Sequence, residues 1–150
     1  MPSDKYSPEP SRSPLFDYLA GIGSHAFMIL TFWHNGNELR SISSRHTAGL
    51  LAVAVAAVVV CSHFAPSASS TLNPGSCALY ALLIAAALRT FGLHAVAGYS
   101  AYLVASEPAA LVIRHLPMGQ VIDAAFSLWC LAALSVYGGK CAKSKMESPQ

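Results

Sequence analysis

Apolar residues recur every three or four positions between residues 15 and 33. This spacing predicts an amphipathic helix, with its apolar face on one side and polar residues mostly on the other. Ser13 followed by Pro14 is typical of a helix start, because a hydroxyl caps the first turn and proline fits its first position. We expect this helix to lie on a membrane surface, although the nearly continuous apolar run at 27–33 also allows it to enter the bilayer. The polar sequence HNGNE at 34–38 then ends it.

Three longer apolar segments follow. They lie at residues 47–65, 77–105 and 118–137. A loop rich in Ser, Pro and Gly at 66–76 separates the first two, and the polar sequence SEPAALVIRHLP at 106–117 separates the last two. Gly138 and Gly139 are expected to end the last segment. Because a bilayer-spanning helix needs about 20 residues, each segment is a candidate span.

The middle segment, residues 77–105, allows two interpretations because Arg89 interrupts it. A turn at Arg89 would bring every Lys and Arg except Arg114 to one side of a membrane, as the positive-inside rule favours. However, residues 77–88 are too few to span, since a span needs about 20 residues, whereas one long tilted helix can span. On length, the sequence predicts one long helix and three spans in total.

Composition supports a membrane protein. The 150 residues are 54% hydrophobic and 11% charged, well below the charge of soluble domains. No formal charge lies between Arg45 and Arg89. The net charge of +2 is too small to indicate a nucleic-acid partner. We therefore predict an all-α integral membrane protein, in which an N-terminal amphipathic surface helix precedes a bundle of three transmembrane helices.

The expected organisation has four parts. These are a polar flexible arm (1–13), the surface helix with its linker (14–40), the three-helix transmembrane anchor domain (41–139) and a polar tail (140–150). Cys61 and Cys77 bracket the loop between the first two spans and could form a disulfide in an oxidising compartment. The alternative is two buried thiols.

Candidate chemistry begins at the mouth of the first span. Ser41 and Arg45 are four residues apart, so a helix would place both on one face at the level of the lipid headgroups. A hydroxyl and a guanidinium there could donate hydrogen bonds to a carbonyl or carboxylate arriving from the membrane. The alternative is a cationic flank whose hydroxyls cap the helix.

His94 is the second candidate, because ionisable side chains inside apolar helices are rare and usually functional. Gly98 lies one turn further on the same face and leaves room for a flat cofactor. Histidine is a common axial ligand of haem iron. The alternative is a neutral histidine bonded to a neighbouring helix. His63 lies at the far end of the first span, so a second haem ligand would have to come from another chain.

Both regions resemble a known family. The sequence SISSRHTAG at 41–49 resembles the Ser-Ile-x-His-Arg-x-Ser/Thr-Gly signature of the cytochrome b subunit of succinate dehydrogenase, the larger membrane anchor of respiratory complex II. The sequence HAVAGYSAYLV at 94–104 resembles the haem helix of that family. Ser44 stands where the signature has histidine, and His46 follows the arginine instead.

The resemblance implies a function, cofactors and partners. It assigns Ser41 and Arg45 to a ubiquinone site and His94 to haem b iron, with Gly98 and His46 beside the haem. The second haem ligand would belong to a second small membrane anchor. The other partners would be an iron–sulfur subunit and a flavoprotein subunit.

On this interpretation the chain is a non-autonomous subunit of succinate dehydrogenase (quinone), with no activity alone. It would lie in the mitochondrial or bacterial inner membrane, with its N-terminus on the matrix or cytoplasmic side. Two alternatives remain open: a non-enzymatic accessory or scaffold subunit of a membrane complex, and a small holin-like pore former.

Overall fold

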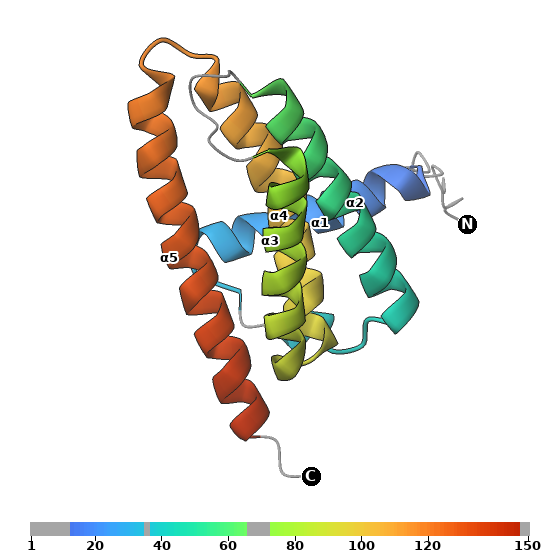
Figure 1. The fold of residues 1–150 in the computed structure, drawn as a ribbon. Coiled ribbons are helices and arrows are strands. Elements are labelled where there is room, and N and C mark those ends of the chain that lie inside the picture. Colours follow the sequence, from blue (N-terminus) through green and yellow to red (C-terminus); the bar gives the residue numbers. More distant parts are fainter. Residues whose placement is uncertain (1–12, 35–36, 66–72, 148–150) are drawn as a thin grey trace, which may run out of the picture.

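The computed structural model describes residues 13–34, 37–65 and 73–147, and all regular structure in these ranges is helical. Five α-helices follow one another along the chain. They are α1 (Pro14–Leu30), α2 (Ser44–Phe64), α3 (Pro74–Leu88), α4 (Leu93–Arg114) and α5 (Gly119–Met146) (Figure 1). Two short 3₁₀ helices, η1 (Asn37–Leu39) and η2 (Arg89–Phe91), lie in the connections. The all-α prediction is confirmed for these residues.

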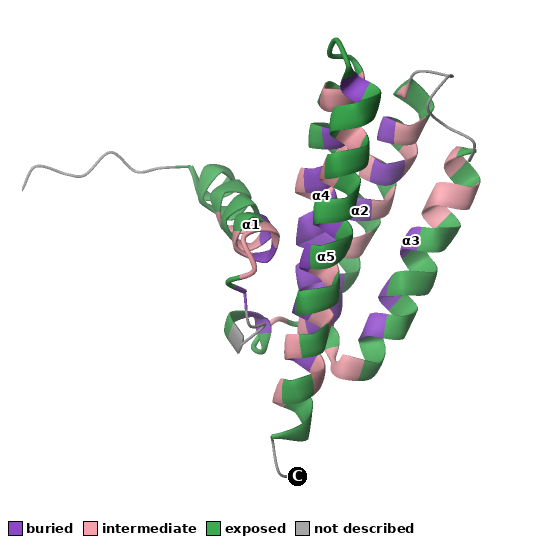
Figure 2. Cartoon of the chain, turned by 90° about the vertical axis from the view of Figure 1, so that its left-hand side faces the viewer, coloured by how far each residue is buried: buried purple, intermediate pink, exposed green. Residues whose placement is uncertain are grey.

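Helices α2 to α5 form an up-and-down bundle, and α4 is its centre. Helix α4 packs against each of the other four α-helices, and the run from Ala95 to Leu103 is buried without interruption. Figure 2 shows buried residues concentrated on α4, whereas the outer faces of α3 and α5 are largely exposed. Such outward apolar faces are expected of helices surrounded by lipid.

The prediction of three spans is wrong in its count. Four helices in the described part of the chain are long and apolar enough to cross a membrane, because residues 77–105 are divided between α3 and α4. Helix α3 begins at Pro74, where the Asn73 side chain caps it, and η2 extends it to Phe91. The segment before Arg89 is therefore longer than the apolar run alone suggested. Gly92, with a φ of 121°, then reverses the chain, a conformation that glycine adopts readily.

Two predicted ends are also wrong. Helix α4 continues through Pro108 to Arg114, so the expected polar connection at 106–117 is mostly helical and the turn itself is short. Proline costs one backbone hydrogen bond in a helix interior, and the packing of α4 against the other helices offsets this. Helix α5 passes through Gly138 and Gly139 to Met146, because its last turns pack beside η2.

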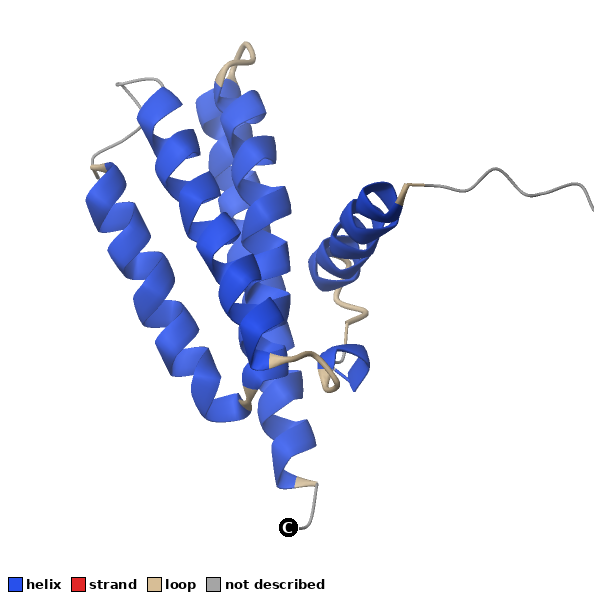
Figure 3. Ribbon diagram, turned by 90° about the vertical axis from the view of Figure 1, so that its right-hand side faces the viewer, coloured by secondary structure: helices blue, strands red, loops and turns tan. Residues whose placement is uncertain are grey.

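The expected N-terminal helix is confirmed as α1, which begins with the Ser13 cap and Pro14. It runs across the bundle rather than along it (Figure 1), and it contacts α4 and α5. Figure 3 shows it nearly end-on, to one side of the four upright helices. Its neighbours in α4 include Ala97 and Ala101, roughly 6 to 12 Å from the start of α4 at 1.5 Å per residue. Amphipathic interfacial helices lie at a comparable depth below a membrane surface.

The hairpin topology separates the charges. One end of the bundle, here called the basic end, collects the start of α2, the α3–α4 turn and the end of α5. Its cations are Arg40, Arg45, Arg89, Lys140, Lys143 and Lys145. The opposite end, here called the Arg114 end, holds Arg114 as the only Lys or Arg in its described residues. The positive-inside rule favours cations on one side of the membrane, and the turn at Arg89 produces this distribution.

Candidate functional site

Ser41 and Arg45 do not share a helix face. Ser43 caps α2 by accepting a hydrogen bond from the His46 N–H, so the helix begins at Ser44 and Ser41 lies in the preceding turn. Both Ser41 and Arg45 are exposed. The geometric reason for pairing Ser41 with Arg45 is therefore lost. Their roles in quinone binding stay predictions of the resemblance.

A pocket at the basic end brings together another hydroxyl and another guanidinium. This pocket, here called the α2–α4 pocket, has a volume of about 420 Å³ and lies between α2, α3 and α4. Ser44 and Thr47 of α2 and Arg89 of η2 line it, and its remaining walls are aliphatic. Arg89 forms no ion pair within the described ranges. The pocket thus offers donor groups at its charged end and apolar walls toward the bundle interior.

The sequence predicts His94 inside an apolar helix, on the half of the membrane nearer Arg45. It is the second residue of α4, so it lies at the basic end, as Arg45 does, but at a helix start rather than within a longer helix. Its Nε2 is buried and has no hydrogen-bond partner within the described residues. A buried nitrogen without a hydrogen bond lowers the stability of the fold, so Nε2 of His94 is a candidate metal-ligand atom.

The room expected beside Gly98 is filled by Tyr137 of α5. A Cβ added at Gly98 would lie 2.1 Å from the Tyr137 hydroxyl oxygen. That hydroxyl donates a hydrogen bond of 2.9 Å to the carbonyl oxygen of His94. Gly98 therefore serves the close packing of α4 on α5, and the His94–Gly98 face of this chain does not fit a porphyrin edge. Haem b ligation stays a prediction of the resemblance.

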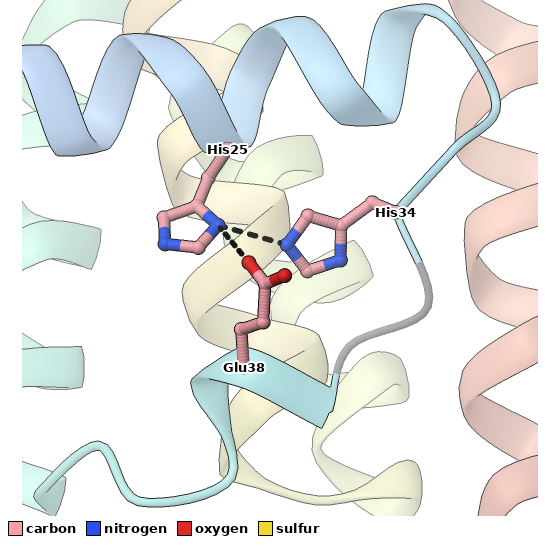
Figure 4. Close-up of side chains that lie close together, drawn as sticks. All are labelled: His25, His34 and Glu38. Carbon is pink, nitrogen blue, oxygen red and sulfur yellow. Dashed lines mark hydrogen bonds and ion pairs between the residues drawn. The ribbon is translucent and has the colours of Figure 1, made fainter.

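A cluster that the sequence did not reveal lies between α1 and η1. His25 of α1, His34 of the following turn and Glu38 of η1, here called the histidine cluster, point toward one another (Figure 4). His25 Nδ1 lies 3.0 Å from His34 Nε2 and 3.8 Å from Glu38 Oε2. Burial, and then the neighbouring His25, hold the pKa of His34 below its usual range. The imidazole of His34 is therefore held in its neutral form at neutral pH.

The turn that carries the cluster is fixed onto α5. Trp129 donates its indole N–H to the carbonyl oxygen of Leu30 at 2.9 Å, and Lys140 donates to the carbonyl oxygen of Phe32. The ring of His34 lies edge-on to Tyr137, with ring centroids 5.3 Å apart. Contacts from a distant helix therefore position this short segment, and no local sequence pattern marks it.

His46 lies in a separate pocket. Its Nδ1 is 3.3 Å from the Ser43 hydroxyl oxygen, and its side chain lines a pocket of about 270 Å³ between α1, α2 and α4. His25 lines the same pocket from α1. This arrangement brings His46 near the histidine cluster and not into the α2–α4 pocket.

The Arg114 end contains a third pocket of about 370 Å³, lined among others by Glu107, Arg114, Tyr99 and Tyr102. Arg114 Nε donates to Asp123 Oδ2 at 2.9 Å, which joins α4 to α5 across their short turn. The cysteines Cys61, Cys77, Cys130 and Cys141 are free thiols. The disulfide considered for Cys61 and Cys77 is therefore not formed.

Comparisons with known proteins do not identify the chain: no family model, curated protein or solved structure matches it. A functional proposal therefore rests on the pockets, on the histidine cluster and on the short motifs of the sequence. Of these features, the α2–α4 pocket has the donor chemistry that the sequence motif led us to expect.

Proposed function

We propose that the chain is a membrane-anchor subunit of a succinate:quinone oxidoreductase and that its quinone site is the α2–α4 pocket. The observation that carries this proposal is that Ser44, Thr47 and Arg89 line the charged end of a pocket whose other walls are aliphatic. Ser44 belongs to the signature-like sequence, but Arg89 replaces Arg45 as the guanidinium. The proposal therefore keeps the expected chemistry and changes the residues that supply it.

The pocket suits a quinone in three respects. Its volume of about 420 Å³ lies within the range of small-molecule sites. Leu51, Leu82 and Val96 provide apolar contacts for a ring that partitions into the bilayer. Its polar residues lie at the basic end, which the positive-inside rule assigns to the matrix or cytoplasmic side. A headgroup held there would be close to a soluble electron donor docked on that side.

The proposed chemistry is a two-electron reduction. Oxidation of succinate to fumarate in the flavoprotein subunit would release two electrons, and the iron–sulfur subunit would pass them to the quinone. Two protons from the same side complete the quinol. Arg89 would stabilise the negative charge that develops on a quinone oxygen, while the Ser44 hydroxyl donates a weaker, neutral hydrogen bond. The chain alone would show no activity.

Co-purification tests the class of protein. Mild-detergent extraction of the chain from its native membrane is expected to recover a flavoprotein, an iron–sulfur protein and a second small membrane protein. A preparation without flavin or iron–sulfur signals would support an accessory or scaffold role instead. The holin-like alternative predicts leakage of vesicles that contain the purified chain, whereas an anchor subunit leaves such vesicles sealed.

Substitutions within the complex test the site. Arg89→Ala is expected to lower succinate–quinone activity about a hundredfold, because it removes a charged donor to the developing oxyanion. Ser44→Ala is expected to lower it roughly fivefold, the value of one neutral hydrogen bond. Arg45→Ala and Ser41→Ala are matched controls outside the pocket. If these two variants lose activity while Arg89→Ala does not, the quinone site follows the sequence resemblance and not the pocket.

A further inference from the structure

The histidine cluster has the composition of a transition-metal site. It supplies two imidazoles and one carboxylate, the ligand set of several zinc enzymes and of mononuclear non-haem iron centres. His25, His34 and Glu38 come from three successive structural elements, and their ligand atoms all lie within 4.8 Å of one another. The quinone proposal does not use any of them.

The spacing of the ligand atoms fits one ion. At a metal–ligand distance of about 2.1 Å, two ligand atoms lie roughly 3.0 Å apart at right angles and roughly 3.4 Å apart in a tetrahedron. The distances from His25 Nδ1 are 3.0 Å to His34 Nε2 and 3.8 Å to Glu38 Oε2. Binding would therefore require shifts of under about 1 Å, by the same geometry. Glu38, whose side chain is 64% exposed, is free to make them.

The residues around the histidine cluster hold its side chains in place. His34 is 3% exposed, and the bonds from Trp129 and Lys140 fix the segment on either side of the α1 end. The cation Lys140 lies close enough to act on His34 and opposes a divalent ion. Because the three ligands carry only one negative charge, this repulsion favours a fourth ligand that is an anion or hydroxide.

We propose that His25, His34 and Glu38 bind one divalent transition-metal ion, with Zn²⁺ the best fit and an exchangeable ligand in the fourth position. Bound metal would fasten α1 to η1 and so fix the segment that leads into α2. This inference is independent of the quinone proposal, since it needs neither the α2–α4 pocket nor a partner subunit.

Metal titration of the whole chain tests the proposal. The chain, without a polyhistidine tag, would be purified in detergent, stripped with a chelator and titrated with Co²⁺ as a spectroscopic probe, and then with Zn²⁺ in competition. We expect one Co²⁺ per chain, visible as d–d absorption, and its displacement by one equivalent of Zn²⁺. Absence of saturable binding to the wild-type chain would overturn the proposal.

Two ligand variants make the test specific. Glu38→Gln and His25→Ala are each expected to weaken Co²⁺ binding by more than about a hundredfold, beyond the typical effect of an outer-shell change. His63→Ala and Glu147→Gln, which remove exposed side chains outside the cluster, should bind as the wild type does. Glu38→Gln retains the shape of an exposed side chain, so its fold should be unaffected and circular dichroism can verify this. Unchanged affinity in a folded Glu38→Gln variant would exclude the site.

Discussion

The two ends of the four-helix bundle differ in whether their arginines form ion pairs. At the Arg114 end, Arg114 is bonded to Asp123 at 2.9 Å, and both side chains are less than one quarter exposed. At the basic end, Arg45 and Arg89 form no ion pair within the described ranges. The ion pair at the Arg114 end therefore joins α4 to α5, whereas Arg45 and Arg89 at the basic end can bind an anionic ligand or partner.

The largest expected effect on stability is at the Arg114 end. Arg114→Ala would leave the Asp123 carboxylate without its partner in a partly buried position, which should cost about 3 kcal/mol of unfolding free energy. Asp123 is already poorly satisfied, because its Oδ1 has no hydrogen-bond partner within the described residues. Arg45→Ala at the basic end should change stability by less than about 0.5 kcal/mol.

Denaturant unfolding in detergent micelles measures both variants. The double variant Arg114→Ala, Asp123→Ala should recover part of the loss, because it removes the stranded charge as well. Equal and small effects of Arg114→Ala and Arg45→Ala would show that the two ends do not differ in this way.

The next effect concerns the packing of α4 on α5 at the basic end. Gly98→Ala should destabilise the chain by about 2 kcal/mol, since the new methyl group overlaps the Tyr137 ring in a closely packed region. Gly49→Ala is the matched control, because a Cβ there meets nothing within 4 Å and alanine favours a helix by up to about 1 kcal/mol. Thermal unfolding distinguishes them. A stable Gly98→Ala variant would mean that the Tyr137 side chain moves aside at little cost in stability. A cofactor could then enter beside His94.

The smallest effect is a pH dependence at the histidine cluster. The lowered pKa of His34 means that the unfolded chain binds a proton more readily than the folded chain does. Stability of the metal-free protein should therefore fall as pH drops below about 6.5, the ordinary histidine value. His25, Lys140 and His94 oppose protonation of His34, whereas Glu38 favours it.

Unfolding curves between pH 8 and pH 5, about the range in which histidine titrates, provide the measurement. The variant His34→Gln should show a flatter profile than the wild type. A wild-type stability that rises on acidification would contradict the assignment of a buried, neutral His34.

Helices could be predicted where the relevant signals are local. The Ser13 cap and Pro14 identified the start of α1, and continuous apolar runs identified the cores of the bundle helices. The break at Arg89 was visible in the charge distribution, but the length of the apolar run before it argued the other way. The helix proved longer than this run because Pro74, Gly75 and Ser76, assigned to a loop, form the start of α3 and Asn73 caps it.

The candidate sites could not be predicted in the same way, because tertiary packing creates them. The α2–α4 pocket joins Ser44 to Arg89, which are far apart in sequence and meet only if the chain turns at Gly92. The spacing of His25, His34 and Glu38 matches no familiar ligand motif. Gly98 has the position expected of a cofactor-facing glycine, yet a tyrosine from another helix fills the space.

The proposed quinone site lies at the basic end, between α2, α3 and α4. The most direct test is to measure, in the purified complex, succinate–quinone activity and succinate oxidation by a soluble dye for Arg89→Ala and Arg45→Ala. We expect Arg89→Ala to lose about two orders of magnitude of quinone activity while dye reduction and subunit content stay unchanged, and we expect Arg45→Ala to retain both activities. Full quinone activity in Arg89→Ala, or a parallel loss of dye reduction, would contradict a quinone site in the α2–α4 pocket.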